Sequence, residues 1–422
     1  MTELTSPSIE QQNAIDAIVS CILDKKPALA FIAPAGCGKT FCLKHIAEDE
    51  RLEEIPMTFT ATTNKAAGII KEDLPTAMTL HKAISLYVAT ELSDEMDKFY
   101  DSKMLRGAEE TVPEKIILDF LSEIGVSVKS FKKESSTEKF LGNNKISSYD
   151  HRIFDRYVTG EYQGGVCFID ESSMLPTKGQ VDDQGKLKAI GLNNAMKVFD
   201  TVVLVGDDSQ LPPINGTSSF EGLDTFRLTE NHRSDQSLLR LLDYARNGQP
   251  LEMFVPREDE KTIRVYQEYL VPDSMYDMDT MIEHNITHIV YRNATRKSIT
   301  RRIRGNDSQP LDGEPVVYKG ANIDDEDGDC ISKNETGVYI DGYGEWKNHK
   351  QYVNKRHFDE YSDNYCYLQF GYAITCHISQ GSSFDYVIIH VNDIPGMVDS
   401  ETERKWIYTS ISRARKGVII IK

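Results

Sequence analysis

The segment APAGCGKT, from Ala33 to Thr40, constrains the fold more strongly than any other part of the chain. The apolar run Ala28–Ile32 precedes it, and a helical pattern starts near Lys39. Such a loop directs backbone N–H groups at phosphate oxygens, while the Lys serves the β/γ-phosphates and the hydroxyl serves Mg²⁺. Ala33 replaces the first Gly of G-x-x-x-x-G-K-T, which a negative φ tolerates. The alternative is a strand-to-helix turn that contains Gly-Lys-Thr by chance.

Short apolar runs recur along the chain, with helical patterns or loops between them. The further runs are Met57–Ala61, Val166–Ile169, Val202–Val205, Ile286–Tyr291, Tyr386–Val391 and Val418–Ile421. Ahead of them, Ile9–Lys25 carries apolar residues at the spacing of an amphipathic helix. This order predicts an α/β protein with two parallel-sheet units.

The composition sets limits on the class of protein. The 422 residues favour two or more domains, and a hydrophobic content of 40% suffices for real cores. No apolar run approaches the ~20 residues of a membrane span, so no membrane association is expected. The N-terminus has no basic and apolar leader, and seven scattered cysteines without a C-x-x-C pair fit a reduced compartment. The net charge of −18 argues, on its face, against a nucleic-acid partner.

Two carboxylates, Asp170 and Glu171, end the apolar run that starts at Val166. In P-loop ATPases a strand-end Asp holds Mg²⁺, and a following Glu orients and deprotonates the attacking water. Two solvated acids would be the ordinary interpretation of this pair alone. With Lys39 and Thr40 upstream, ATP hydrolysis is the better interpretation.

Three further side chains are candidates for the γ-phosphate. Gln210 lies in Gly206-Asp207-Asp208-Ser209-Gln210-Leu211-Pro212 after the next strand, although this segment equally suits a Gly-Asp turn closed by prolines. Arg233 and Arg413 are candidate arginine fingers, which accelerate phosphoryl transfer by ~10³–10⁵. Taken alone, either Arg is more often a surface residue.

Two segments interrupt the α/β pattern. Ala89–Gly160 is rich in charge, acidic over residues 89–123 and basic over 124–160. Gly305–Asn364 has turns between short β-type pieces and predicts a small β-barrel or hairpin insertion.

Taken in order, these motifs resemble those of the superfamily 1 helicases. The residues that carry the resemblance are Gln11, Gly36 to Thr40, Asp170-Glu171, Gly206 to Pro212, Arg233, Thr375-Cys376-His377-Ile378-Ser379-Gln380-Gly381 and Ser412 to Arg415. The Thr-x-His-x-x-Gln-Gly segment and the size are most similar to the 5′→3′ (1B) branch, which includes RecD-like helicases and the phage Dda helicase. The resemblance covers both α/β units and neither insertion.

The resemblance implies two RecA-like domains, with ATP between them and single-stranded DNA across both. It divides the chain into domain 1A (1–88 and 161–250), a wedge-bearing 1B (89–160), domain 2A (251–304 and 365–422) and an SH3-like 2B (305–364).

The resemblance also implies roles for individual residues. Gln11 would contact adenine, although Ser8-Ile9-Glu10-Gln11 is also a capping-box pattern, and both roles are compatible. Gln210 would couple the γ-phosphate to movement between the domains. Arg233 and Arg413 would contact the γ-phosphate. The remaining nucleotide-binding residues would be Ala35, Gly36, Cys37, Gly38, Lys39, Thr40 and Gly381, with Mg²⁺ held by Thr40 and Asp170.

A DNA track would run along loop ends rich in hydroxyl and amide groups, which suit phosphates without base specificity. The implied contacts are Thr62, Thr63, Asn64, Thr79, His81, Thr375, His377 and Gln380. Ala61-Thr62-Thr63 departs from the Ala-Pro-Thr of the family, and Ile378 stands where a basic residue is usual. His81 and His377 are alternatively ordinary half-buried histidines.

Three charged or aromatic clusters remain. Residues 292–304 hold six basic side chains and no acid, which suits DNA contact and a solvated helix face equally. Trp346, with Lys347, Lys350, Lys355 and Arg356, would stack on single strands or be buried in a β-module. The acidic run 324–329 lacks the spacing of a calcium loop and is interpreted as a solvated loop.

These expectations combine into an ATP-dependent DNA helicase that acts 5′→3′ on single strands in replication, recombination or repair. The alternatives are an RNA helicase of the same superfamily and a nucleotide-dependent binding switch. The expected partners are single-stranded DNA, strand junctions and a single-strand-binding or replisome protein. A monomer is expected, in the cytoplasm of a prokaryotic or phage-infected cell. The charge of −18 then predicts a localised DNA track with modest, salt-sensitive affinity.

Overall fold

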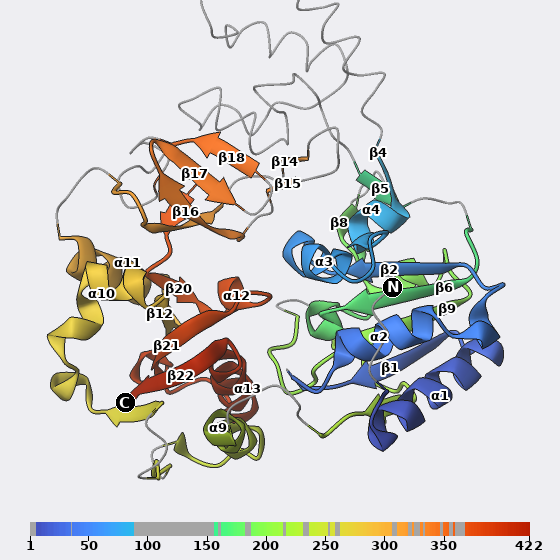
Figure 1. Cartoon of the computed structure of the whole chain (residues 1–422), viewed down its shortest axis with the longest axis horizontal. Coiled ribbons are helices and arrows are strands. Elements are labelled where there is room, and N and C mark those ends of the chain that lie inside the picture. Colours follow the sequence, from blue (N-terminus) through green and yellow to red (C-terminus); the bar gives the residue numbers. More distant parts are fainter. Residues whose placement is uncertain are drawn as a thin grey trace, which may run out of the picture.

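Two parallel sheets, each with its own helices, form the body of the protein, and a smaller antiparallel sheet lies beside the second (Figure 1). The computed structural model describes residues 6–34, 36–87, 156–158, 162–181, 187–213, 217–230, 236–251, 254–257, 262–305, 310–319, 323–324, 330–331, 334–346, 349–353, 358 and 368–422. We call the first sheet and its helices the N-lobe, and the second sheet and its helices the C-lobe.

The N-lobe sheet has the strand order β10-β1-β9-β6-β2-β3, and its pairings are parallel. Its strands are β1 (Ala28–Ile32), β2 (Met57–Ala61), β3 (Met78–Thr79), β6 (Val166–Asp170), β9 (Thr201–Gly206) and β10 (Thr225–Arg227). The α-helices are α1 (Ile9–Leu23), α2 (Lys39–Ala47), α3 (Asn64–Lys71), α4 (Leu80–Ile84) and α8 (Leu192–Ala195), with 3₁₀ turns η1 (Glu50–Leu52) and η3 (Ser172–Met174). Short antiparallel pairs join β4 (Ser85–Tyr87) to β5 (Arg156–Val158) and β7 (Gln180–Val181) to β8 (Leu187–Ala189).

The central strands of the N-lobe are buried on both faces, which explains their continuous apolar character. In β9, Val203 and Val205 pack into the core beneath α1, α2 and α3, whereas Val202 and Leu204 face the opposite core. This alternation follows from the two-residue period of a strand. Because the strands are parallel, the segments that follow β1, β6 and β9 meet at one edge of the sheet.

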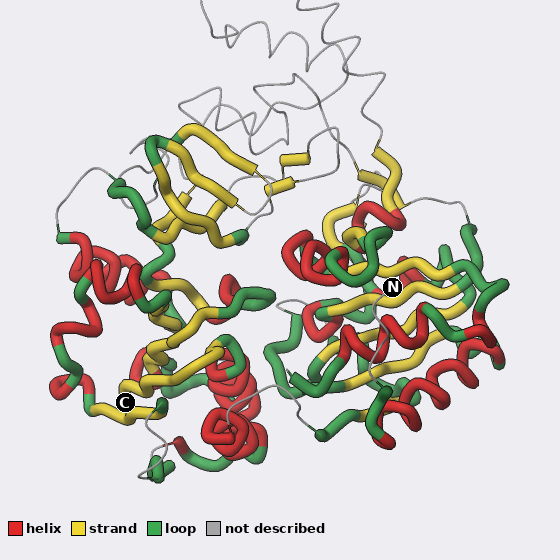
Figure 2. Tube along the Cα trace, in the orientation of Figure 1, coloured by secondary structure: helices red, strands yellow, loops and turns green. Residues whose placement is uncertain are grey.

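The C-lobe sheet is also parallel, in the order β11-β22-β21-β12-β20. Its strands are β11 (Ile263–Tyr266), β12 (Ile286–Val290), β20 (Ala373–Thr375), β21 (Phe384–His390) and β22 (Ala414–Ile421). Its helices are α9 (Gln236–Arg246), α10 (Met278–Glu283), α11 (Asn293–Arg304), α12 (Cys376–Ser379) and α13 (Ser400–Ile411), with 3₁₀ turns η5 (Glu268–Leu270), η6 (Asp273–Tyr276) and η8 (Val391–Asp393). Figure 2 shows the strands of each lobe between helices.

The antiparallel sheet has the order β18-β17-β16-β13-β19. Its strands are β13 (Pro315–Tyr318), β16 (Thr336–Ile340), β17 (Tyr343–Trp346), β18 (His349–Tyr352) and β19 (Leu368–Phe370), and a separate pair joins β14 (Ile323–Asp324) to β15 (Cys330–Ile331). The predicted β-type insertion is therefore present. An SH3-like fold for it stays a prediction.

The predicted α/β class with two parallel sheets is confirmed. The first helix ends at Leu23 instead of the predicted Lys25, because Lys25 takes a left-handed conformation with φ 54°. The predicted wedge segment 89–160 lies outside the described residues except for β5, and the acidic run 324–329 except for Asp324. None of the described helices combines the length and apolar character needed to cross a bilayer.

Candidate functional site

The loop between β1 and α2 has the conformation that phosphate binding requires. Gly36 and Gly38 adopt φ of 90° and 88°, a region that side chains with a Cβ rarely occupy. Gly38 is the N-cap of α2, so the backbone N–H groups of the first helical turn face the loop. Lys39 Nζ donates to the carbonyl of Ala33 at 2.8 Å, which holds the ammonium group over the loop. Ala33 does not have a positive φ. An alanine in place of the first Gly of the motif therefore causes no backbone strain.

Gln11 forms the expected capping box and also contacts the phosphate-binding loop. Ser8 and Gln11 form a complete capping box, with Gln11 N donating to Ser8 Oγ and Ser8 N donating to Gln11 Oε1 at 3.0 Å. Gln11 Nε2 donates to the carbonyl of Cys37 at 3.2 Å, and the side chain is buried. The cap thus fixes the amide beside the phosphate-binding loop. Contact with adenine stays a prediction.

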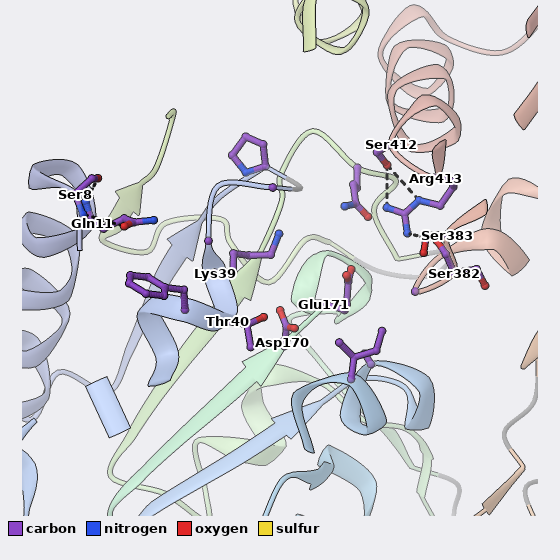
Figure 3. Close-up of a pocket in the computed structure, with 18 of the residues that line it drawn as sticks. Ser8, Gln11, Lys39, Thr40, Asp170, Glu171, Ser382, Ser383, Ser412 and Arg413 are labelled. Carbon is purple, nitrogen blue, oxygen red and sulfur yellow. Dashed lines mark hydrogen bonds between the residues drawn. The ribbon is translucent and has the colours of Figure 1, made fainter. Parts of the chain in front are cut away.

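The two carboxylates at the end of β6 differ in their surroundings. Asp170 is buried, and its Oδ1 has no hydrogen-bond partner within the described part of the chain. Burial, followed by the charge of Glu171, raises the pKa of Asp170 to about 6. Glu171 adopts a left-handed conformation with φ 52°, which costs a residue other than Gly ~1–3 kcal/mol. Such strain is typical of functional positions, and the Glu171 side chain lines the same pocket as Lys39 (Figure 3).

Gln210 follows β9 and is buried at the same edge of the sheet. Its Oε1 also lacks a hydrogen-bond partner among the residues described. A buried carbonyl oxygen without a partner costs ~1–3 kcal/mol, so the position suits an amide that acquires a ligand.

Arg413 enters from the C-lobe, two residues beyond α13. Its guanidinium is buried and is held by Ser412 Oγ at 2.8 Å and by the carbonyl of Thr409 at 3.2 Å. Figure 3 shows it on the far side of the pocket from Lys39 and Thr40. The other finger candidate, Arg233, lies outside the described residues.

These groups line one pocket of about 710 Å³ between the lobes. Of the predicted residues, it brings together Gln11, Gly36, Gly38, Lys39, Thr40, Asp170, Glu171, Gln210, Gly381 and Arg413. Cys37 is buried behind the loop, and Ala35 is not described. Residues that the sequence did not single out are Ser6, Pro7, Pro34, Phe41, Ala66, Ile69, Ser382 and Ser383. Phe41 and Ser382 directly follow the motifs, which is the signal that could have identified them.

The residues of the pocket have the chemistry of a nucleoside triphosphate-binding site. A sequence profile of the AAA domain matches residues 7–268, which include the phosphate-binding loop and both carboxylates. The chain belongs to this AAA-domain family. A profile of the UvrD-like helicase C-terminal domain matches residues 370–421, which include Gly381 and Arg413. The two domains in this order make the protein a superfamily 1 helicase with an ATP-binding site, as the resemblance implied.

Solved helicase structures are similar at a lower level. Pif1 from Bacteroides bound to single-stranded DNA is 16% identical, with a TM-score of 0.45 over 99% of this chain and 92% of that one. Pif1 from Candida albicans is 15% identical, with a TM-score of 0.43 over 99% and 94%. Likeness at this level carries no conclusion about activity. No curated protein matches the chain significantly.

The predicted DNA contacts of this helicase lie on both lobes. Thr63 caps α3, Thr62 Oγ1 donates to the carbonyl of Glu171 at 3.0 Å, and Thr79 Oγ1 accepts from Lys82 N. Asn64 begins α3, and Thr375 occupies the N-cap position of α12 without a side-chain capping hydrogen bond. Gln380 is buried, with neither amide atom hydrogen-bonded to a described residue.

His81 and His377, which were predicted to contact DNA or to be ordinary half-buried histidines, are both half buried. Burial lowers the pKa of His377, which favours its neutral form. Their contact with DNA stays a prediction.

The basic cluster 292–304 is only partly exposed on this helicase: Arg292, Arg301 and Arg302 are exposed, whereas Arg296 and Arg304 are buried. Arg304 lies in the core and pairs with the buried Glu314 at 2.5 Å, instead of sharing an exposed stripe with Lys297 and Arg301. Arg292 pairs with Asp393 at 2.5 Å, Arg302 pairs with Asp273 at 3.0 Å, and Arg296 is buried. Burial therefore removes two of the six charges from the surface, and ion pairs within the lobe engage the exposed Arg292 and Arg302.

Trp346 is buried in the antiparallel sheet, which confirms the second of its two predicted alternatives and excludes stacking on single strands. It is 6% exposed and packs edge-on against Tyr318 at a centroid distance of 5.8 Å. Its indole N–H donates to the carbonyl of Glu335, which satisfies the polar atom inside the core. Lys347, Lys355 and Arg356 lie outside the described residues.

Proposed function

We propose that this superfamily 1 helicase uses ATP hydrolysis to translocate 5′→3′ on single-stranded DNA and to unwind duplex DNA. The observation that carries the proposal is the shared pocket. Lys39, Asp170 and Gln210 come from the N-lobe, whereas Gly381 and Arg413 come from the C-lobe. A nucleotide held there touches both lobes, so binding and hydrolysis change the free energy of their closure.

The residues of the pocket fit the steps of ATP hydrolysis. Lys39 binds the β/γ-phosphate oxygens, and Glu171 orients and deprotonates the attacking water. Arg413 stabilises the charge that develops on the transferred phosphoryl group, and Gln210 contacts the γ-phosphate or the water. Arg233 is proposed as a second contact to that group.

Mg²⁺ is the proposed metal, because the oxygens present suit it. Asp170 Oδ1 is a buried acceptor without a partner among the described residues, and the Thr40 hydroxyl lies in the same pocket. Oxygen ligands and substrate phosphates are what Mg²⁺ prefers. When bound, the ion neutralises charge on the β- and γ-phosphates.

The proposed DNA path crosses the loop ends that carry Thr62, Thr63, Thr375 and Gln380. These groups contact phosphates, so binding would be independent of sequence and sensitive to salt. The proposed domains are 1A, 1B, 2A and 2B with the boundaries given above, and the proposed active unit is a monomer. A single-strand-binding or replisome protein is the proposed protein partner.

The decisive experiment is unwinding of duplexes that carry either a 5′ or a 3′ single-stranded tail. Unwinding of the 5′-tailed duplex alone is expected. Parallel ATPase assays with DNA and RNA oligonucleotides test the alternatives. Preferential stimulation by RNA would indicate an RNA helicase, and no stimulation by either would indicate a nucleotide-dependent switch.

A further inference from the structure

The turn that follows β9, residues 207–211, is held by two consecutive residues of α13 in the other lobe. Tyr408 Oη donates to Asp207 Oδ2 at 2.7 Å, and the backbone N–H of Leu211 donates to Thr409 Oγ1 at 2.9 Å. Tyr408 and Thr409 are both 0% exposed. Because water does not reach these groups, breaking either bond would leave a buried polar atom unsatisfied.

Asp207 connects this contact to Gln210. Its Oδ1 accepts from the backbone N–H of Ser209 at 3.1 Å, and its carbonyl accepts from the backbone N–H of Gln210 at 3.1 Å. Asp207 is only 2% exposed, and burial raises its pKa. The carboxylate therefore closes the turn that places Gln210 against the pocket.

Thr409, which holds the N-lobe turn, also contacts Arg413. The carbonyl of Thr409 accepts from Arg413 Nε at 3.2 Å, so the same helical turn holds both the N-lobe turn and the guanidinium. Arg246, on α9, donates through Nη2 to Tyr408 Oη at 3.1 Å. Burial raises the pKa of Tyr408, which keeps its hydroxyl protonated as a donor to Asp207. We call Asp207, Tyr408 and Arg246 the interlobe relay.

We propose that Tyr408 is a positioning residue that keeps Gln210 and Arg413 aligned at the same end of the nucleotide. Because Tyr408 and Thr409 hold the turn of Gln210 and Thr409 also holds Arg413, a shift of α13 moves Gln210 and Arg413 together, and their contacts form or break together. The proposal rests on the proposed function and assigns to the Tyr408 hydroxyl the alignment of Gln210 with Arg413. Neither Tyr408 nor Asp207 lines the pocket.

The test compares two substitutions that each remove one buried hydroxyl. Tyr408→Phe removes the Asp207 contact, and Tyr372→Phe removes a 3.1 Å bond to Glu314 from a tyrosine that is also 0% exposed. We expect Tyr408→Phe to lower the DNA-stimulated kcat about tenfold, the effect of one hydrogen bond to a charged group, with KM for ATP within about twofold. Tyr372→Phe should lower Tm to a similar extent and leave kcat unchanged.

A double-mutant cycle with Asp207→Asn identifies the partner. If the two residues act through one hydrogen bond, the double variant loses no more kcat than the more affected single variant. Equal kcat in Tyr408→Phe and Tyr372→Phe, or fully additive losses in the cycle, would overturn the proposal. Stimulation of the wild-type ATPase by DNA tests the proposed function separately. If it is absent, the same comparison of basal kcat still tests the relay.

Discussion

Lys65 Nζ on α3 of the N-lobe donates a 2.7 Å hydrogen bond to Ser382 Oγ in the C-lobe. A second bond of 2.9 Å reaches Thr336 Oγ1 in the antiparallel sheet. One ammonium group thus joins three parts of the chain beside the nucleotide pocket, which Ser382 also lines.

The pH dependence of stability should report on Lys65. Burial lowers its pKa to about 8, whereas an unfolded lysine titrates near 10.4. Between these values the unfolded state binds more protons, so the Lys65 contribution to the free energy of unfolding rises from pH 8 to 10 and is flat below pH 8. The difference in Tm between wild type and Lys65→Met should therefore shift in favour of wild type as the pH rises from 8 to 10. Lys71→Met, at the exposed end of the same helix, is the control; an identical profile for both variants would contradict the prediction.

Lys39→Ala should abolish ATP turnover while the fold is retained. The ammonium group is the N-lobe charge held over the phosphate-binding loop, and loss of such a contact costs about 10²-fold or more in kcat. ATPase assays and circular dichroism measure the two effects. Lys44→Ala, on the same helix and paired with Asp73, should behave like wild type. Turnover retained by Lys39→Ala would refute the site.

Arg413→Ala should bind nucleotide but hydrolyse it about 10³-fold more slowly, since a finger acts on the charge of the transition state. A fluorescent ATP analogue reports binding, and phosphate release reports turnover. The matched control is Arg302→Ala, which removes a C-lobe arginine paired with Asp273 away from the pocket. Unchanged turnover in Arg413→Ala would make the arginine structural.

Gly38→Ala should weaken ATP binding at least tenfold. A Cβ there would lie 2.6 Å from Gln11 Nε2, so Gln11 must move and lose its bond to Cys37. Gly222→Ala is the control, because Gly222 has φ 76° and no atom within 4 Å of an added Cβ. Both substitutions carry the left-handed cost of about 1–2 kcal/mol, and only Gly38→Ala should change the Kd for ATP. Equal Kd values in the two variants would contradict this.

Arg304→Met should destabilise the C-lobe by about 3–5 kcal/mol, because it leaves the Glu314 carboxylate buried without its cation. Urea unfolding measures the loss. The double variant Arg304→Met/Glu314→Gln should recover most of it. Recovery would show that the basic cluster serves packing, whereas a stable single variant would show that the ion pair contributes little.

The nucleotide site was largely predictable because its geometry is local. A strand, a glycine turn and a helix place Lys39 and Thr40 whatever surrounds them, and Asp170 is the last residue of its strand. The parallel sheet then brings these strand ends to one edge. Arg413 was predictable only through motif order, since no local pattern states that it faces a pocket in the other lobe.

The residues whose role the sequence left open depend on distant partners. The spacing within residues 292–304 could not reveal that Glu314 draws Arg304 into the core, nor could the neighbours of Trp346 reveal that Tyr318 covers it. A charge or an aromatic ring is solvated or buried according to what packs against it, and those groups come from elsewhere in the chain.

The net charge of −18 is a sum over the chain and says little about any one groove. Local motifs established the chemistry of this protein, because backbone conformation within a few residues builds a phosphate-binding loop. The bonds from Lys65 to Ser382 and from Tyr408 to Asp207 arise only when the lobes pack together. Hydrogen bonds between residues far apart in the chain depend on tertiary packing, and these contacts are where the two lobes become coupled.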